Sequence, residues 1–282
     1  MNFFSLISSS SAYLGLSYIL RFILTLSLAK ILSSTELGIY SWALTAFGLL
    51  SIFVNFGQDN FLLRKIPEQK NINKSSVDNV VSFSFRLVLR NCLVVIPFTY
   101  LLLYIFREYL ETIEYSRTLI LLSLALPFGA FTLINSSILR TNERPLMAQI
   151  PDSIIQPGLL LIFVYSFFLF TNFELNARWF AIFNLFGWII AFGFSLWACK
   201  FFFYKYRPTL KKSPSYRKWH SDSSTILLGV LAWSLLGRSD VFFLAFLVSP
   251  EHVGFYFISM RLAEFTLFFA TVSFYIWSGE IS

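Results

Sequence analysis

Charged side chains within long apolar stretches are the residues of this sequence best suited to chemistry. Arg21 lies about 20 Å into the first apolar stretch, at about 1.5 Å per helical residue. A charge at such depth costs about 2.5 to 3.5 kcal/mol if hydrocarbon surrounds it, so it is a functional candidate by default. The other deep charges are Arg238, Asp240, Arg261 and Glu264, with Arg86 and Arg90 nearer the end of their stretch.

The deep set carries more positive than negative charge. Guanidinium groups stay charged in proteins and bind phosphate through paired hydrogen bonds. A cavity lined by these residues would suit a phosphate-bearing or otherwise anionic substrate. Two alternatives remain open: Arg86 and Arg90 could reach toward lipid headgroups, and Arg261 could form a structural pair with Glu264, three residues on.

The composition indicates that lipid surrounds most of the chain. Of its 282 residues, 56% are hydrophobic and only 13% are charged, and the mean hydropathy is +0.68. Soluble domains are about 25% charged. A membrane-spanning helix needs about 20 mostly apolar residues, and the sequence predicts an all-α, polytopic transmembrane bundle of about eight spans. These spans cover residues 8–32, 38–57, 79–105, 118–139, 153–171, 179–203, 225–248 and 253–276.

Basic residues are concentrated in the even-numbered loops between these spans. The only basic residues in the odd-numbered loops are Arg107, Arg117 and Arg178. Because cytoplasmic loops are enriched in Lys and Arg, we expect a cytoplasmic N-terminus. The run in loop 204–223 could bind nucleic acid or anionic lipid, but an orientation signal and linker is favoured, and no nucleic-acid partner is expected. The twelve basic residues of the even loops are Arg64, Lys65, Lys70, Lys74, Arg140, Arg144, Lys205, Arg207, Lys211, Lys212, Arg217 and Lys218.

A short repeat divides the chain. LAKILSSTELGIY, residues 28–40, aligns without a gap to LAFLVSPEHVGFY, residues 244–256, at an offset of 216. Both copies end one span, make a tight external turn and open the next span. The similarity could come from convergence of short loops. A duplicated unit of six spans, with both copies in the same orientation across the membrane, is favoured.

The repeat predicts two domains. Residues 1–215 would form a first six-span lobe with a basic linker at its end, and residues 216–282 the first two spans of a second lobe. Four more spans would complete that lobe, so we expect a truncated form of a longer protein rather than a distinct shorter form.

Enzyme signatures are missing from the sequence. It contains no G-x-x-x-x-G-K-[ST], H-E-x-x-H or G-x-S-x-G motif. Its two cysteines, Cys92 and Cys199, give no metal-binding or redox spacing. We therefore expect neither an enzyme nor a bound cofactor or metal.

Three stretches resemble the polysaccharide exporters of the multidrug/oligosaccharidyl-lipid/polysaccharide superfamily, specifically the bacterial O-antigen type flippases of lipid-linked oligosaccharides. They are residues 28–66, where a Gly-x-Tyr opening leads to Phe56-Gly57 and Arg64, residues 136–151 and residues 237–265. The resemblance implies two six-span lobes around a central cavity and transport by alternating access.

The resemblance also implies a substrate and its contacts. Arginines of spans one, two and eight of related flippases meet the pyrophosphate, which by position selects Arg21, Arg64 and Arg261. We add Arg238 for its depth, and Asp240 or Glu264 as candidates for ion coupling. The implied partners are an undecaprenyl-pyrophosphate-linked oligosaccharide, membrane lipids, a polysaccharide polymerase and a chain-length regulator, at the bacterial inner membrane.

Two other functions were weighed. A drug or metabolite exporter of the same superfamily would carry soluble cations and should show more acids than bases in its cavity. A polymerase or glycosyltransferase of the pathway would need a large external loop with catalytic groups, whereas the longest external loop here has only about a dozen residues by span length.

Overall fold

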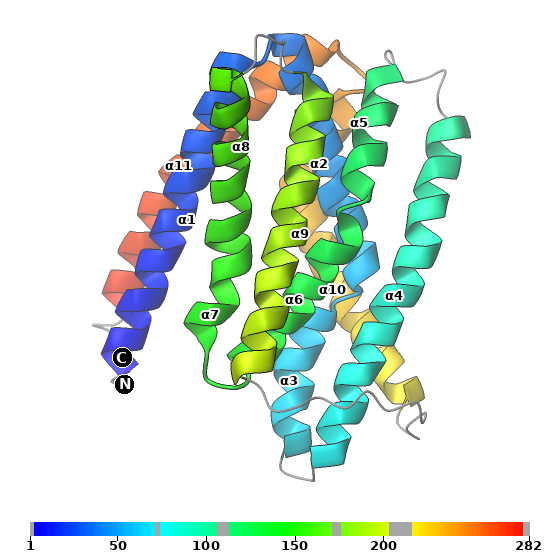
Figure 1. Ribbon diagram of the computed structural model, residues 1–282, viewed down its shortest axis with the longest axis vertical. Coiled ribbons are helices and arrows are strands. Elements are labelled where there is room, and N and C mark those ends of the chain that lie inside the picture. The colour runs from blue at the N-terminus through cyan, green and yellow to red at the C-terminus, as the bar shows by residue number, and fades with distance from the viewer. Residues whose placement is uncertain (1–2, 71–73, 106–112, 171–175, 203–215, 279–282) are drawn as a thin grey trace.

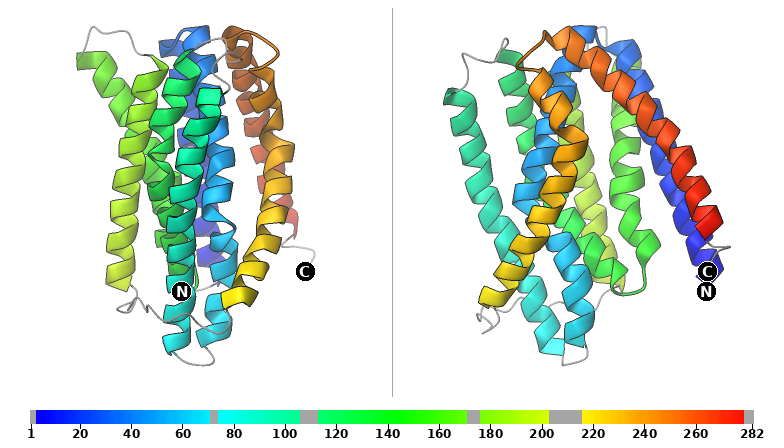
Figure 2. Two further views of the ribbon diagram at one scale, coloured as in Figure 1. Left: turned by 90° about the vertical axis from the view of Figure 1, so that its right-hand side faces the viewer. Right: turned by 180° about the vertical axis from the view of Figure 1, so that it is seen from behind.

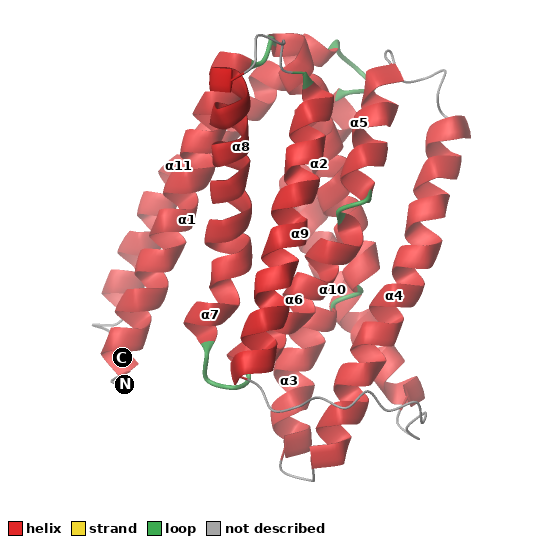
Figure 3. Ribbon diagram, in the orientation of Figure 1, coloured by secondary structure: helices red, strands yellow, loops and turns green. Residues whose placement is uncertain are grey.

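Every secondary-structure element that the computed structural model describes is a helix. The described residues are 3–70, 74–105, 113–170, 176–202 and 216–278 (Figures 1 and 3). The helices are α1 (Phe3–Ile31), α2 (Ser34–Asn55), α3 (Gln58–Lys70), α4 (Lys74–Ile105), α5 (Ile113–Ser123), α6 (Leu126–Arg140), α7 (Pro145–Ile150), the π-turn η1 (Pro151–Ile155), α8 (Gln156–Phe170), α9 (Ala177–Phe202), α10 (Tyr216–Leu244) and α11 (Pro250–Ser278).

These helices form eight rods, which confirms the predicted all-α membrane bundle. Three rods are composite: α2 with α3, α5 with α6, and α7 with η1 and α8. Within the described residues, six rods are long and apolar enough to cross a membrane. The other two, α1 and α11, match the predicted first and eighth spans.

Three predicted loops are wrong in part because helices occupy them, and α7 (Pro145–Ile150) lies within the predicted loop 140–152. Residues 58–70 of the predicted loop 58–76 form α3, which follows a break at Phe56 and Gly57 with φ of 53° and 69°. A Cβ on Gly57 would lie 2.8 Å from the side chain of Ile226, so glycine is required there for space as well as conformation. The predicted loop 204–223 is helical from Tyr216, where Trp219 packs on Phe83 with ring centroids 5.6 Å apart.

Two lysines of α3 contact neighbouring segments at one end of the bundle. Lys70 Nζ donates to Thr141 O at 2.7 Å and to Asn142 Oδ1 at 3.0 Å. Lys65 Nζ lies 3.5 Å from Asp222 Oδ2 of α10. Which side of the membrane this end faces stays a prediction, and Lys205, Arg207, Lys211 and Lys212 lie outside the described residues.

Contacts at the other end join the turns predicted to be external. Arg178 donates two hydrogen bonds to the Glu114 carboxylate, from Nε at 2.6 Å and Nη2 at 2.9 Å. The Glu36 N–H bonds to Ser33 Oγ at 3.2 Å, as a capping box predicts. The Glu36 carboxylate, however, accepts the N–H of Ala177 at 2.7 Å and so caps α9 instead.

The two copies of the repeat pack against each other through glycine. A Cβ added to Gly38 would lie 1.7 Å from the carbonyl oxygen of Pro250, and one added to Gly254 would lie 2.5 Å from that of Ser34. At the offset of 216, Ser34 corresponds to Pro250 and Gly38 to Gly254, so the contact is reciprocal. α2 and α11 therefore touch backbone to backbone.

α10 contacts the preceding helices at both ends of the bundle, whereas α10 and α11 separate from each other. Trp42 Nε1 on α2 donates to the carbonyl oxygen of Phe242 on α10 at 3.2 Å. From the turn that joins them, α10 and α11 diverge toward the opposite end of the bundle (Figure 2, right). This divergence leaves space between helices that carry the deep arginines.

Replacing Gly38 by alanine should destabilise the fold. The new methyl group would overlap the α11 backbone, which cannot move aside like a flexible side chain, so we expect a loss of about 1 to 3 kcal/mol in the free energy of unfolding. The measurement is thermal and denaturant unfolding in detergent micelles. Gly193→Ala on α9 is the matched control, because nothing lies within 4 Å of its Cβ position; equal stability of the two variants would contradict the proposed contact.

Candidate functional site

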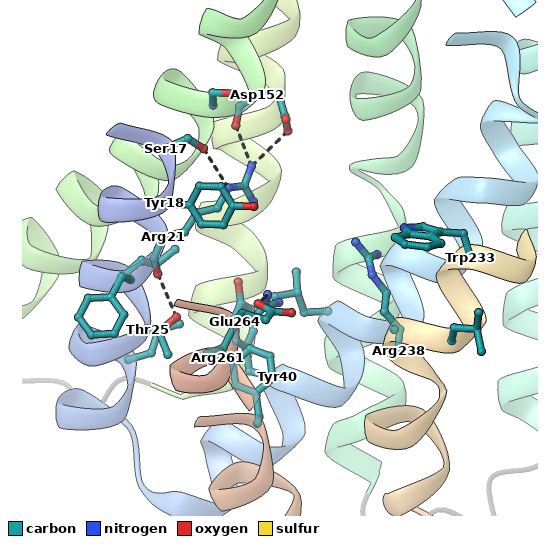
Figure 4. A pocket seen from close by; sticks show the side chains of 18 residues that line it. Ser17, Tyr18, Arg21, Thr25, Tyr40, Asp152, Trp233, Arg238, Arg261 and Glu264 are labelled. Carbon is teal, nitrogen blue, oxygen red and sulfur yellow. Dashed lines mark hydrogen bonds and ion pairs between the residues drawn. The ribbon is translucent and has the colours of Figure 1, made fainter. Parts of the chain in front are cut away.

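A cavity of about 910 Å³ lies between α1, α2, η1, α10 and α11 (Figure 4). Its volume falls within the range of about 300 to 1,000 Å³ that is usual for small-molecule sites. Its walls combine aromatic and aliphatic side chains with a small set of charges. The lining residues are Ser17, Tyr18, Arg21, Phe22, Leu24, Thr25, Leu28, Tyr40, Leu44, Asp152, Ser153, Trp233, Leu236, Gly237, Arg238, Phe257, Arg261 and Glu264.

Four of the residues predicted from the sequence line this cavity. Arg21 comes from α1, Arg238 from α10, and Arg261 and Glu264 from α11. In Figure 4, Arg21 and Arg238 stand on opposite sides and the Arg261–Glu264 pair lies between them. The fold therefore brings together charges that are up to 243 residues apart in the sequence (264 minus 21).

Arg21 is held by groups on two elements. Its Nη2 donates to the main-chain oxygen of Asp152 at 3.0 Å and lies 3.5 Å from the Asp152 carboxylate. Its Nε donates to Ser17 Oγ, one turn earlier on α1, at 3.4 Å. The side chains of Arg21 and Asp152 are 50% and 42% exposed, so the pair is open to the cavity.

Arg238 lies against a helix surface that has no side chain at the point of contact. A Cβ on Gly48 of α2 would lie 2.1 Å from Arg238 Nη1, so only glycine leaves room for the guanidinium there. Because Gly48 offers no acidic side chain to pair with, the guanidinium donors stay available to a ligand in the cavity. Arg238 thus packs against α2, whereas the Asp240 carboxylate accepts the Tyr256 hydroxyl of α11.

Arg261 and Glu264 form an ion pair within α11, as their spacing permits. Arg261 Nη1 lies 2.5 Å from Glu264 Oε2, and the guanidinium carbon lies 5.0 Å above the centre of the Phe257 ring. The two side chains are 37% and 43% exposed. The pair thus presents both a donor and an acceptor edge to the cavity.

The other predicted residues lie outside the cavity lining. The Asp240 carboxylate accepts the Tyr256 hydroxyl, which ties α10 to α11. Arg64 is exposed on α3. On α4, Arg86 is half-buried, and Arg90 Nη2 lies 3.5 Å from His220 Nε2. The functional roles assigned to all eight residues from the sequence stay predictions.

Sequence reasoning missed two residues that shape the site. Asp152 was assigned to a loop boundary and so left out of the deep charges, although an acid between Pro151 and Pro157 at the start of an apolar span is itself a signal. Gly48 carried no signal, because its role depends on a side chain 190 residues later (238 minus 48).

The cavity as described holds more positive than negative charge. Its three arginines face two acids, Asp152 and Glu264, which leaves a formal excess of one. Among the described residues, no group of three His, Cys, Asp or Glu side chains could hold a metal ion. The arrangement is therefore suited to binding an anion through guanidinium groups.

Water-soluble reagents should reach this cavity. In a background with Cys92→Ala and Cys199→Ala, Gly237→Cys should react with a charged, membrane-impermeant thiol reagent, because nothing lies within 4 Å of its Cβ position. Leu93→Cys is the control: Leu93 is 70% exposed on α4 but lies outside the cavity, so lipid should shield it. Equal labelling of both variants would contradict a hydrated cavity.

Comparisons with known proteins agree with this architecture. One solved structure, described as the inward-facing conformation of a multidrug resistance MATE family transporter of the MOP superfamily, superposes with a TM-score of 0.63 at 19% sequence identity. The match covers 87% of this chain and 57% of that protein, and at this identity it shows a shared fold alone. A comparison with curated proteins finds no match. Residues 2–274 match the family described as Polysaccharide biosynthesis protein, and the chain belongs to that family.

Proposed function

We propose that the chain takes part in moving a lipid-linked oligosaccharide, carried on undecaprenyl pyrophosphate, across the bacterial inner membrane for O-antigen or capsule biosynthesis. The observation that supports this most directly is the excess of arginine in a cavity between membrane helices. Membership of a polysaccharide biosynthesis family and the fold of a known transporter support the same proposal.

The cavity residues suggest which group would bind each part of such a substrate. Guanidinium groups of Arg21, Arg238 and Arg261 would bind the pyrophosphate through charge-assisted hydrogen bonds. Sugars would contact hydroxyl and aromatic groups such as Thr25 and Trp233, and the polyprenyl tail would stay in the bilayer. The two lobes would rock to open the site to each side in turn, with Glu264 as a candidate for ion coupling.

Export of a drug or metabolite is the second candidate, because the solved structure of similar fold is a multidrug transporter. A cationic substrate would require a cavity with an excess of acids. Since the described cavity has three arginines and two acids, we favour the anionic substrate.

Neutralising the cavity arginines should weaken pyrophosphate binding. We expect Arg238→Ala to raise the Kd of the purified chain for geranyl pyrophosphate at least about tenfold, because a hydrogen bond to a charged group contributes about 1.5 to 3 kcal/mol. Arg238→Lys should retain part of the affinity, since lysine keeps the charge but loses the paired geometry. Isothermal titration calorimetry provides the measurement.

Arg64→Ala is the matched control, because Arg64 is exposed on α3 outside the cavity. The Kd of Arg64→Ala should equal that of the unaltered chain. A raised Kd would instead agree with the family resemblance, which assigns Arg64 to the pyrophosphate site. Unchanged affinity in Arg238→Ala, or tighter binding of an organic cation than of geranyl pyrophosphate, would contradict the proposal.

A further inference from the structure

The segment Pro151 to Pro157 breaks the helical hydrogen-bond pattern at the cavity wall. In η1 the chain makes π-type turns, and the N–H of Gln156 donates to Pro151 O, five residues earlier. The next residue, Pro157, has no N–H to donate. Wide turns of this type leave main-chain groups without their usual helical partners.

The carbonyl oxygen of Asp152 is the group left over. Its donor in an α-helical pattern would be Gln156, which is bonded to Pro151 O, and its donor in a π pattern would be Pro157. A carbonyl without a partner is costly within a membrane protein. Arg21 Nη2 fills this position at 3.0 Å and comes from a helix 131 residues away in the sequence.

Asp152 thus offers Arg21 two acceptors, one on its main chain and one on its side chain (Figure 4). The carboxylate contact is long, at 3.5 Å, and both side chains are about half exposed to the cavity. A partly exposed ion pair of this length is weak. A phosphate in the cavity could offer the same guanidinium shorter, paired bonds, so the contact is one that an anion can break.

We propose that Asp152 is a displaceable counter-ion that sets the affinity of the cavity for anions. In the empty cavity its carboxylate holds Arg21 against η1, and the Arg21 guanidinium donates to the orphaned carbonyl oxygen of Asp152. A phosphate-bearing ligand must detach the Arg21 guanidinium from the Asp152 carboxylate in order to bind it. Asp152 therefore selects against weakly charged anions, which cannot compete with a fixed carboxylate. This inference rests on the proposed function and adds a specificity-determining residue to it.

Replacing the carboxylate by an amide tests the competition. The Kd of Asp152→Asn for geranyl pyrophosphate should fall about two- to fivefold, which corresponds to the loss of one partly exposed ion pair. A residue with a purely structural role would weaken binding when altered, so tighter binding is the informative direction. Asparagine keeps the size of the side chain and leaves the backbone of η1 unchanged.

Arg21→Gln separates this competition from a general change in charge. Removing any acid from the cavity should favour an anion, and Glu264→Gln should do so with or without Arg21. The gain from Asp152→Asn should instead disappear in the Arg21→Gln background. An unchanged or raised Kd in Asp152→Asn, or a gain that persists in full without Arg21, would overturn the inference alone. Absence of binding by the unaltered chain would overturn the proposed function and the inference together.

Discussion

Two helix backbones touch where Gly38 of α2 meets Gly254 of α11, and the position of α11 against the other cavity helices depends on this contact. A single methyl group on either glycine would overlap the carbonyl oxygen of Pro250 or Ser34. Small residues permit such close approach between membrane helices, which then gain van der Waals contact along their length. The contact fixes α11, and with it Arg261 and Glu264, against α2.

The free-energy cost of placing a charge in a membrane explains how the arginines of the cavity are arranged. Two of the three cavity arginines have compensating neighbours: Arg21 has a carboxylate and a carbonyl, and Arg261 has an acid on its own helix. Arg238 instead packs beside Gly48. None of these pairs is sealed from the cavity, so the charges remain available to a ligand. In the proposed function, such a site would keep two of its arginines paired when empty and still offer donors to an anion.

The sequence predicted the parts of this structure that depend on local pattern. Hydropathy located eight spans, and spacing offered the Arg261–Glu264 pair as one alternative. Depth in the apolar stretches selected Arg21 and Arg238, which line the same cavity. It also identified the repeat whose two copies meet at Gly38 and Gly254. Each of these predictions uses residues close in sequence or a period that a helix imposes.

The missing parts depend on contacts between distant residues. α3 was read as a loop, because Arg64, Lys65 and Lys70 made it polar and no sequence pattern showed the left-handed break at Phe56. Asp152 belongs to the site because the π-turn and Pro157 leave its carbonyl oxygen without a helical donor, and Arg21 of α1 donates to it. The sequence pattern did not show this contact. The resemblance selected Arg64 by its position in the chain, whereas the described cavity lining includes no residue of α3.

The central claim is that an arginine-rich cavity between membrane helices holds a lipid pyrophosphate. Native mass spectrometry of the chain, purified from bacterial membranes that make surface polysaccharide, tests it most directly. The unaltered chain should carry an undecaprenyl-pyrophosphate-linked glycan, and a folded variant with alanine at Arg21, Arg238 and Arg261 should not. Equal retention of that lipid by the triple variant, or its absence from both proteins, would contradict the claim.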